Sequence, residues 1–112
     1  MNQNPFLTAL AALAAIAVTL SVALAADPKA GRKKATACQT CHGIDGIAKI
    51  PIAPNIAGES QIYLETQLKA FRSGKRQQEM MSVVAGQLSD EDIADISAWY
   101  SSITITATLP AE

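Results

Sequence analysis

The sequence predicts an all-α protein with its helices arranged around one irregular stretch. The helix-forming residues Ala, Leu, Ile and Gln outnumber those that favour strands. Three segments open with helix-start signals, at Asp27, Ser60 and Ser89. Glycine and proline cluster over residues 43–58, where the helical pattern disappears. The 112 residues are enough for one domain and not two.

The first helix is predicted to start with Asp27 as N-cap and Pro28 in the first helical position, where proline's missing N–H is not needed. We expect it to run to about Cys38. Small residues, Gly31 and Ala35 among them, form one of its faces. Such a face lets another helix cross closely.

The second helix is predicted to begin after Ser60 and to end near Ser73, with Gly74 as the stop. Its apolar stripe has the spacing i, i+4 and i+7, formed by Leu64, Leu68 and Phe71. The preceding loop, residues 43–58, is rich in isoleucine, at Ile44, Ile47, Ile50, Ile52 and Ile56. Because these side chains need burial, we expect an ordered loop.

The last helix has the clearest start in the chain. Ser89 is its predicted N-cap, Asp92 completes a pair like a capping box, and Leu88 and Ile93 can form a hydrophobic staple. The helix is expected to reach Ile103. An acidic run in its first turn, Asp90 to Asp92, is read as helix stabilisation. The segment before it, with Met80 and Met81, is expected to be irregular.

The N-terminus is typical of an export signal. Residues 6–26 are almost entirely apolar, and Ala23-Leu24-Ala25 has the small-x-small pattern of a signal peptidase site. We therefore predict a signal peptide over 1–25, with the mature chain placed in the periplasm. Because no Lys or Arg precedes the apolar run, an uncleaved membrane anchor stays an alternative.

The mature chain is predicted to hold one domain over 26–103 and a C-terminal tail over 104–112. The tail alternates like a strand, yet no partner strand is evident, so we read it as extended. The formal net charge is −1, and no basic stripe with interleaved aromatics occurs. Both observations argue against a nucleic-acid partner.

The motif that carries chemistry is Cys38-Gln39-Thr40-Cys41-His42. Two thiols three positions apart, followed by an imidazole, form the signature of c-type haem attachment, with thioether bonds from both sulfurs and His42 on the iron. A zinc site, a thioredoxin-like redox pair and a plain disulfide are the alternatives. Zinc needs four ligands, and the chain has no further Cys or His. The redox pair belongs in a βαβ setting that this sequence lacks.

A second ligand to the iron cannot be another imidazole, because His42 is the only histidine. Apart from the initiator, the only methionines are Met80 and Met81. A thioether is a soft axial ligand that stabilises ferrous iron. Either methionine is therefore a candidate, against the alternative that each fills the core.

These motifs follow one another in an order that resembles the class I cytochromes c. The resemblance is to the small soluble bacterial forms and to single domains of dihaem ones, and it extends from Gly31 to Ile103. The residues that carry it are the C-x-x-C-H, Pro54-Asn55-Ile56-Ala57-Gly58, Tyr63-Leu64, Gln67-Leu68, Phe71, Gly74-x-Arg76, Met81 and Leu88-Ser89-Asp90-Glu91-Asp92-Ile93.

The resemblance implies a class I cytochrome c fold, with crossed N- and C-terminal helices around a covalently bound haem. It implies Met81 as the sixth ligand, with Met80 as the alternate. It also implies that the carbonyl of Pro54, with Pro51 as the alternate, accepts the Nδ1–H of His42. Such outer contacts fix the ring of a ligating histidine.

The function that follows is one-electron transport by a periplasmic carrier that is not an enzyme. Its partners would be a reductase or an oxidase, docked transiently, and the basic residues Lys69, Arg72, Lys75 and Arg76 either steer that encounter or complement a helix dipole. One alternative is a haem c subunit fixed in a larger dehydrogenase or oxidase complex. The other is a catalytic or ligand-binding haem with an open sixth position.

Overall fold

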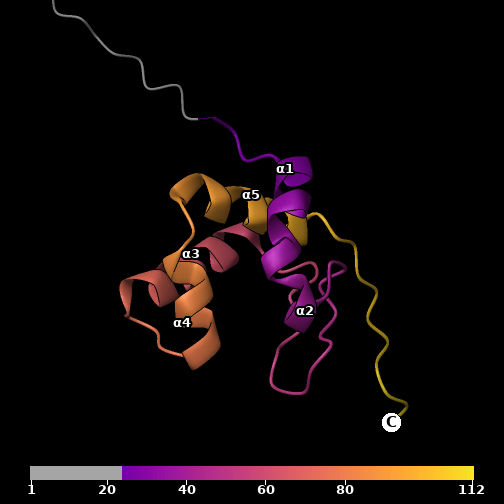
Figure 1. The fold of residues 1–112 in the computed structure, drawn as a ribbon. Coiled ribbons are helices and arrows are strands. Elements are labelled where there is room, and N and C mark those ends of the chain that lie inside the picture. Colours follow the sequence, from indigo (N-terminus) through magenta and orange to yellow (C-terminus); the bar gives the residue numbers. More distant parts are fainter. Residues whose placement is uncertain (1–23) are drawn as a thin grey trace, which may run out of the picture.

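A computed structural model describes residues 24–112, so most of the predicted signal peptide lies outside the described residues. The helices are α1 (Pro28–Lys34), the 3₁₀ helix η1 (Ala35–Ala37), α2 (Gln39–His42), α3 (Gln61–Ser73), α4 (Glu79–Gly86) and α5 (Asp90–Ser101) (Figure 1). Residues 24–112 contain no strand, which confirms the all-α prediction. Within the same range, no helix has the length and apolar character needed to cross a bilayer.

α1 begins as predicted and ends earlier than predicted. The Asp27 carboxylate accepts the Lys29 N–H at 2.8 Å, and Pro28 occupies the first turn. The helix stops at Lys34 and continues only as the 3₁₀ turn η1, instead of running to Cys38. The Thr36 hydroxyl donates to the Lys33 carbonyl at 2.7 Å. Side chains that bond to nearby backbone in this way compete with regular helix.

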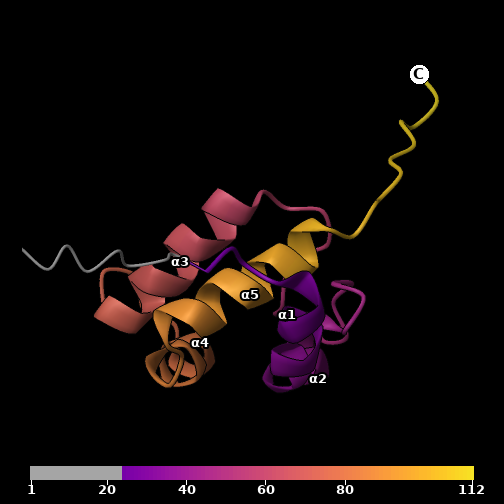
Figure 2. The same ribbon diagram turned by 90° about the horizontal axis from the view of Figure 1, so that it is seen from above.

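α1 and α5 cross in close contact, with α5 lying between α1 and α3 (Figure 2). Gly31 makes the contact possible, because a Cβ at this position would lie 1.8 Å from the Asp95 carbonyl oxygen. The crossing of the N- and C-terminal helices is therefore confirmed. This crossing fixes the position of α5 relative to α1, the helix that precedes the cysteine motif.

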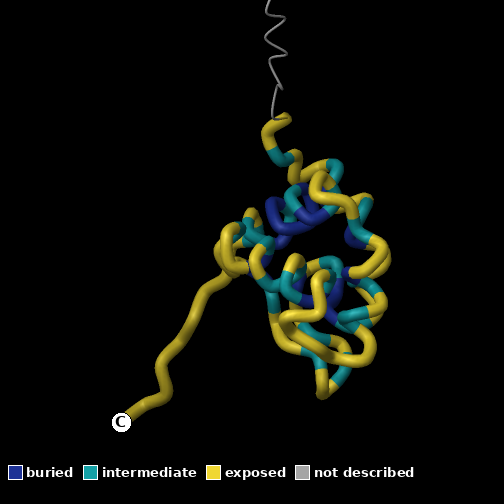
Figure 3. The backbone as a smooth tube through the Cα atoms, turned by 90° about the vertical axis from the view of Figure 1, so that its left-hand side faces the viewer, coloured by how far each residue is buried: buried dark blue, intermediate teal, exposed yellow. Residues whose placement is uncertain are grey.

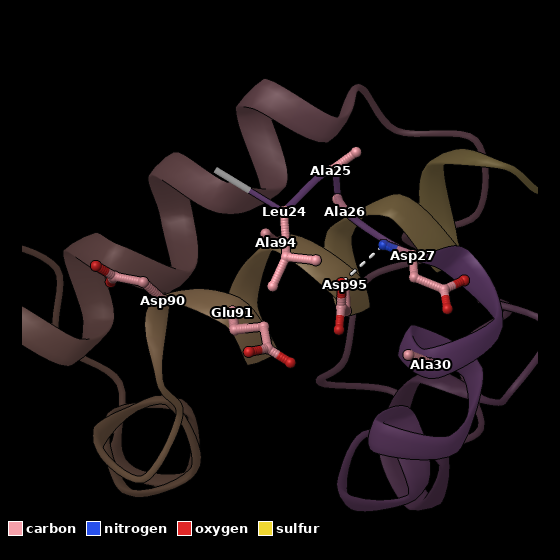
Figure 4. A pocket seen from close by; sticks show the side chains of 9 residues that line it. All are labelled: Leu24, Ala25, Ala26, Asp27, Ala30, Asp90, Glu91, Ala94 and Asp95. Carbon is pink, nitrogen blue, oxygen red and sulfur yellow. Dashed lines mark hydrogen bonds between the residues drawn. The ribbon is translucent and has the colours of Figure 1, made fainter. Parts of the chain in front are cut away.

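A cluster of ion pairs, in which only the Asp95 side chain is buried, reinforces this crossing. The Lys34 ammonium lies 2.7 Å from the Asp95 carboxylate and 3.1 Å from both Glu91 and Asp92. The other carboxylate oxygen of Asp95 accepts the Asp27 N–H at 2.8 Å, beside a shallow hollow between α5 and the segment before α1 (Figure 4). The hydrogen bond from Lys34 is the main cause that lowers the pKa of Asp95. Two residues of the acidic run, Glu91 and Asp92, thus form ion pairs with Lys34 that join α5 to α1.

α3 has the predicted bounds. The Ser60 hydroxyl accepts the Tyr63 N–H at 3.1 Å, and Gly74 ends the helix in the left-handed region at a φ of 81°. Leu64 and Phe71 on this helix are buried, as the apolar stripe predicts. The central core cluster joins three elements through Ala35, Leu64, Ile96 and Tyr100.

The segment expected to be irregular before the last helix is itself helical. Met80 and Met81 lie in the first turn of α4, which begins after the N-cap Gln78. Glutamine is outside the group of favoured N-cap residues, so no sequence signal marks this start. α5 follows after a short turn and opens with the predicted capping box between Ser89 and Asp92.

The C-terminal tail leaves the body of the protein after α5 (Figure 1). Residues 103–112 form neither helix nor strand, and residues 104–112 are exposed along their whole length (Figure 3). The strand-like alternation of this segment therefore does not produce a strand.

Candidate haem site

The cysteine motif forms a single helical turn. The His42 N–H donates to the Cys38 carbonyl at 2.9 Å, so α2 places the histidine one turn beyond the first cysteine. Both cysteines are free and partly exposed. Burial, with a smaller effect of nearby Cys41, raises the pKa of the Cys38 thiol to about 11. Two thiol groups and an imidazole are thus presented by five consecutive residues, Cys38 to His42.

The ring of His42 is held in one orientation. The side chain is 8 % exposed, and its Nδ1 lies 2.9 Å from the carbonyl oxygen of Pro54. A carbonyl only accepts hydrogen bonds, so Nδ1 must carry the proton in this contact. The lone pair then lies on Nε2, which is the atom free to bind a metal.

The loop after α2 folds back on itself and brings Pro54 opposite His42. The Gly46 carbonyl accepts the N–H groups of Ile56 at 2.8 Å and Ala57 at 3.1 Å. Gly46 has a φ of 72°, and a Cβ there would lie 2.6 Å from the Ala57 backbone nitrogen. Glycine is therefore required at this position. These backbone contacts place Pro54 opposite His42, whereas two of the loop's isoleucines, Ile47 and Ile52, are 43 % and 77 % exposed.

Two aromatic side chains of α5 hold the backbone directly after His42. The Tyr100 hydroxyl donates to the Gly43 carbonyl, and the Trp99 ring N–H donates to the Ile44 carbonyl, both at 2.9 Å. Tyr100 is 1 % exposed, and burial raises its pKa, so the hydroxyl stays protonated and donates. We call this pair the aromatic clamp.

Sequence spacing places Trp99 and Tyr100 on the apolar face of α5, where they match the crossing of the terminal helices, and it predicts no hydrogen-bonding role for them. Their polar atoms were the available signal, because a buried Tyr or Trp usually needs a hydrogen-bond partner. Nothing local in the sequence identifies those partners, which lie 55 and 57 positions away.

The two candidate methionines differ in exposure. Met80 is 57 % exposed, whereas Met81 is partly buried. Both lie on α4, which packs against α3. Figure 1 shows α3 and α4 on one side of the molecule and α2 with its loop on the other. His42 and the two methionines therefore come from opposite sides.

Comparison with known proteins identifies the family. A family model described as cytochrome c matches residues 28–104, which is more than half of the chain. The chain belongs to the cytochrome c family. The resemblance found in the order of the sequence motifs is thereby confirmed.

Individual relatives agree with this cytochrome c assignment. The chain is 49 % identical to cytochrome c-554(548) of Halomonas halodenitrificans over 81 residues, covering 70 % of this chain and 98 % of that protein. It is 41 % identical over 78 residues to cytochrome c4 of Pseudomonas aeruginosa, covering 70 % of this chain and 39 % of the relative. The chain thus spans less than half the length of this cytochrome c4.

A solved structure shows the same fold. The crystal structure of reduced recombinant cytochrome c4 from Pseudomonas stutzeri superposes with a TM-score of 0.67 and 35 % sequence identity. The match covers 71 % of this chain and 47 % of the cytochrome c4 chain. The fold is accordingly the all-α fold of class I cytochromes c.

The cofactor of this cytochrome c is haem c with its iron, and its function is electron transfer. The residues fit that cofactor. Cys38 and Cys41 present sulfurs on one turn, and His42 has its Nδ1–H committed to a carbonyl, which leaves Nε2 for iron. Zinc has no comparable site in residues 24–112, where no group of three or more His, Cys, Asp or Glu could hold a metal ion.

Half of the predicted basic cluster has a structural role. Arg72 pairs with Asp90 and also donates to the Leu88 carbonyl at 2.9 Å, which ties α3 to the start of α5. The Arg76 guanidinium lies 4.5 Å from the centroid of the Phe71 ring. Lys69 and Lys75 are exposed. Arg76 is exposed too, and Lys69 lies 3.7 Å from the Glu65 carboxylate, so Lys75 is the member of the cluster for which no ion pair or side-chain hydrogen bond is seen in residues 24–112.

Proposed function

We propose that the chain is an exported, periplasmic one-electron carrier in which His42 and Met81 are the axial ligands of the haem iron. Cys38 and Cys41 would hold the haem through thioether bonds. One contact carries the proposal, the 2.9 Å hydrogen bond between His42 Nδ1 and the Pro54 carbonyl. In the neutral ring this contact selects the tautomer with its proton on Nδ1 and its lone pair on Nε2, the atom that would bind iron.

Exposure favours Met81 over Met80 as the sixth ligand. A ligand that is held against a buried metal must lose most of its contact with water, and Met80 is 57 % exposed. Met81 is already partly buried in the same helical turn. The thioether of Met81 would stabilise the ferrous state.

When bound, the haem supplies a reversible one-electron couple. The side chains of the protein determine how that couple is used. His42 and Met81 together would fill both axial positions and so keep substrates from the iron, which supports a carrier and not an enzyme. The aromatic clamp and Pro54 restrain His42 on both sides, at Gly43 and at Nδ1. A restrained ligand changes position little when the charge on the iron changes.

Absorption spectra of the exported protein and its variants test this proposal. The oxidised wild-type protein is expected to show the methionine–iron charge-transfer band. Met81→Ala is expected to lose it, and the matched control Met80→Ala to keep it. Carbon monoxide is expected to bind the reduced Met81→Ala variant and not the reduced native protein. A native protein that binds carbon monoxide without denaturation would contradict the carrier assignment.

Export is supported by the apolar leader and the predicted cleavage site before Ala26. Fractionation of cells that express the full chain tests it. We expect haem-containing protein in the periplasm, with Ala26 as its N-terminal residue. Protein that stays with the membranes and keeps its leader would favour the anchored alternative.

Docking to a reductase or oxidase would rely on exposed charge, and Lys69 and Lys75 are exposed. Electron-exchange rates measured against ionic strength test this steering. The rate is expected to depend on salt and to lose part of that dependence in a Lys69→Gln, Lys75→Gln variant. A flat salt profile would remove the steering role. Purification of the exported protein as a stable complex would instead favour the alternative of a complex subunit.

A further inference from the structure

We infer that Gln78 is a positioning residue that holds the backbone of Met81 and so controls how readily the sixth ligand leaves the iron. The inference rests on the proposed ligation by Met81. Gln78 is the N-cap of α4 and lies just before its first residue.

The side chain of Gln78 caps α4 directly at Met81. Its amide oxygen accepts the Met81 N–H at 2.7 Å. The backbone N–H of Gln78 donates to the Ser82 hydroxyl at 3.1 Å, and its carbonyl accepts the Ser82 N–H at 2.8 Å. Met81 thus lies inside a closed set of hydrogen bonds between residues 78 and 82.

This arrangement determines the stability of the first turn of α4. The helix has eight residues, which is too short to be stable by itself, so its start depends on capping and packing. The hydrogen-bond partners of Gln78, Met81 and Ser82, lie only three and four positions away, and Gln78 itself is exposed. Loss of the cap would let the first turn open while the rest of the protein stays folded.

Opening of that turn can be measured through competition at the iron. An external ligand that replaces the methionine binds only the open form, so its apparent dissociation constant falls as the open population rises. Imidazole is a suitable probe, because it binds ferric haem iron and His42 is the only histidine of the chain. The readout is the loss of the methionine–iron charge-transfer band as imidazole is added to the oxidised haem protein at pH 7.

The decisive variant is Gln78→Ala. Removal of an N-cap side chain typically costs about 1 kcal/mol, which corresponds to about a fivefold change in an equilibrium constant. We expect the apparent dissociation constant for imidazole to fall about fivefold. Gln78→Asp, which supplies a favoured N-cap acceptor, is expected to return it to within about twofold of the native value.

Gln77→Ala is the matched control. Gln77 is the preceding exposed glutamine, and its amide makes only a 3.5 Å contact, to the Gly74 carbonyl. Its imidazole affinity is expected to equal that of the native protein. A general loss of stability without a positioning role would lower the melting temperature and leave the imidazole affinity in native buffer unchanged.

Two results would overturn the inference, and they can be told apart. If the native protein shows the methionine band but Gln78→Ala binds imidazole as the native protein does, Gln78 has no positioning role and the proposed function stands. If the native oxidised protein lacks the band, the ligation by Met81 is wrong, and the inference fails with it.

Discussion

The surroundings of His42 and those of Met81 are built in different ways. His42 and the residues after it contact groups 12, 55 and 57 positions away, through Pro54, Trp99 and Tyr100. Met81 is held by Gln78, only three positions away. One side of the site therefore depends on the tertiary fold, and the other on a local helix cap.

Burial follows the same division. His42 is 8 % exposed and Tyr100 1 % exposed, whereas Met81 is only partly buried and Gln78, which caps it, is exposed. Long-range contacts among buried groups are lost only when the whole domain unfolds, while local contacts at the surface can open independently. If His42 and Met81 are the axial ligands, as proposed above, the structure predicts that His42 is held firmly and that Met81 can be released from the iron.

The largest loss of stability is expected from a glycine substitution on the His42 side, compared with a glycine substitution on α4, the helix of Met81. Gly31→Ala should lower the free energy of unfolding by about 3 kcal/mol, because its Cβ would lie 1.8 Å from the Asp95 carbonyl and force α1 and α5 apart. Chemical denaturation followed by circular dichroism measures this loss.

Gly86→Ala, at the end of α4, is the matched control. A Cβ at Gly86 meets nothing within 4 Å, so the change should be neutral or stabilise the protein by up to about 1 kcal/mol. A similar loss in both variants would contradict the view that the α1–α5 crossing supports the His42 side specifically.

A smaller effect is expected from removal of one hydroxyl of the aromatic clamp. Tyr100→Phe leaves the Gly43 carbonyl without its buried partner, which should cost about 1–3 kcal/mol of unfolding free energy. Tyr63→Phe is the control, because Tyr63 is 49 % exposed. The two variants are compared by thermal unfolding. Equal melting temperatures would show that the Tyr100 hydroxyl contributes nothing to the stability of the His42 side.

Acid should lower the stability of the α1–α5 crossing, which supports the His42 side, by protonating Asp95. Lys34 holds the pKa of Asp95 below its ordinary value in the folded protein, so the carboxylate contributes stability above its unfolded pKa of about 3.9. That contribution is lost as the pH falls through the lower, folded pKa.

The variant Asp95→Asn tests this. It should melt at a lower temperature than the native protein at pH 7, and the difference should shrink below about pH 4. Thermal unfolding between pH 7 and pH 3 measures it. A constant difference across this range would exclude the charge of Asp95 as the cause.

Features with local causes were the ones that could be predicted from the sequence. The caps at Asp27, Ser60 and Ser89 and the stop at Gly74 each depend on residues within a few positions, and all four occur in the structure. The cysteine motif is equally local, and for that reason the cofactor was predictable.

The contacts that organise the site were not predictable in the same way. The clamp joins residues separated by more than fifty positions, and so does the pair between Lys34 and Asp95. α4 was missed for a different reason, because its N-cap is a glutamine, a residue that does not usually mark a helix start. Only the fold reveals which polar atoms meet.

A denaturant titration of the oxidised haem protein, followed by two signals, tests the unequal restraint of the two sides most directly. The methionine–iron charge-transfer band reports the proposed bond between Met81 and the iron. Far-ultraviolet circular dichroism reports the helices that frame His42. We predict that the band disappears at a lower guanidinium concentration than the helical signal. Coincident transitions of the two signals would contradict the account, because Met81 would then be released only when the whole domain unfolds.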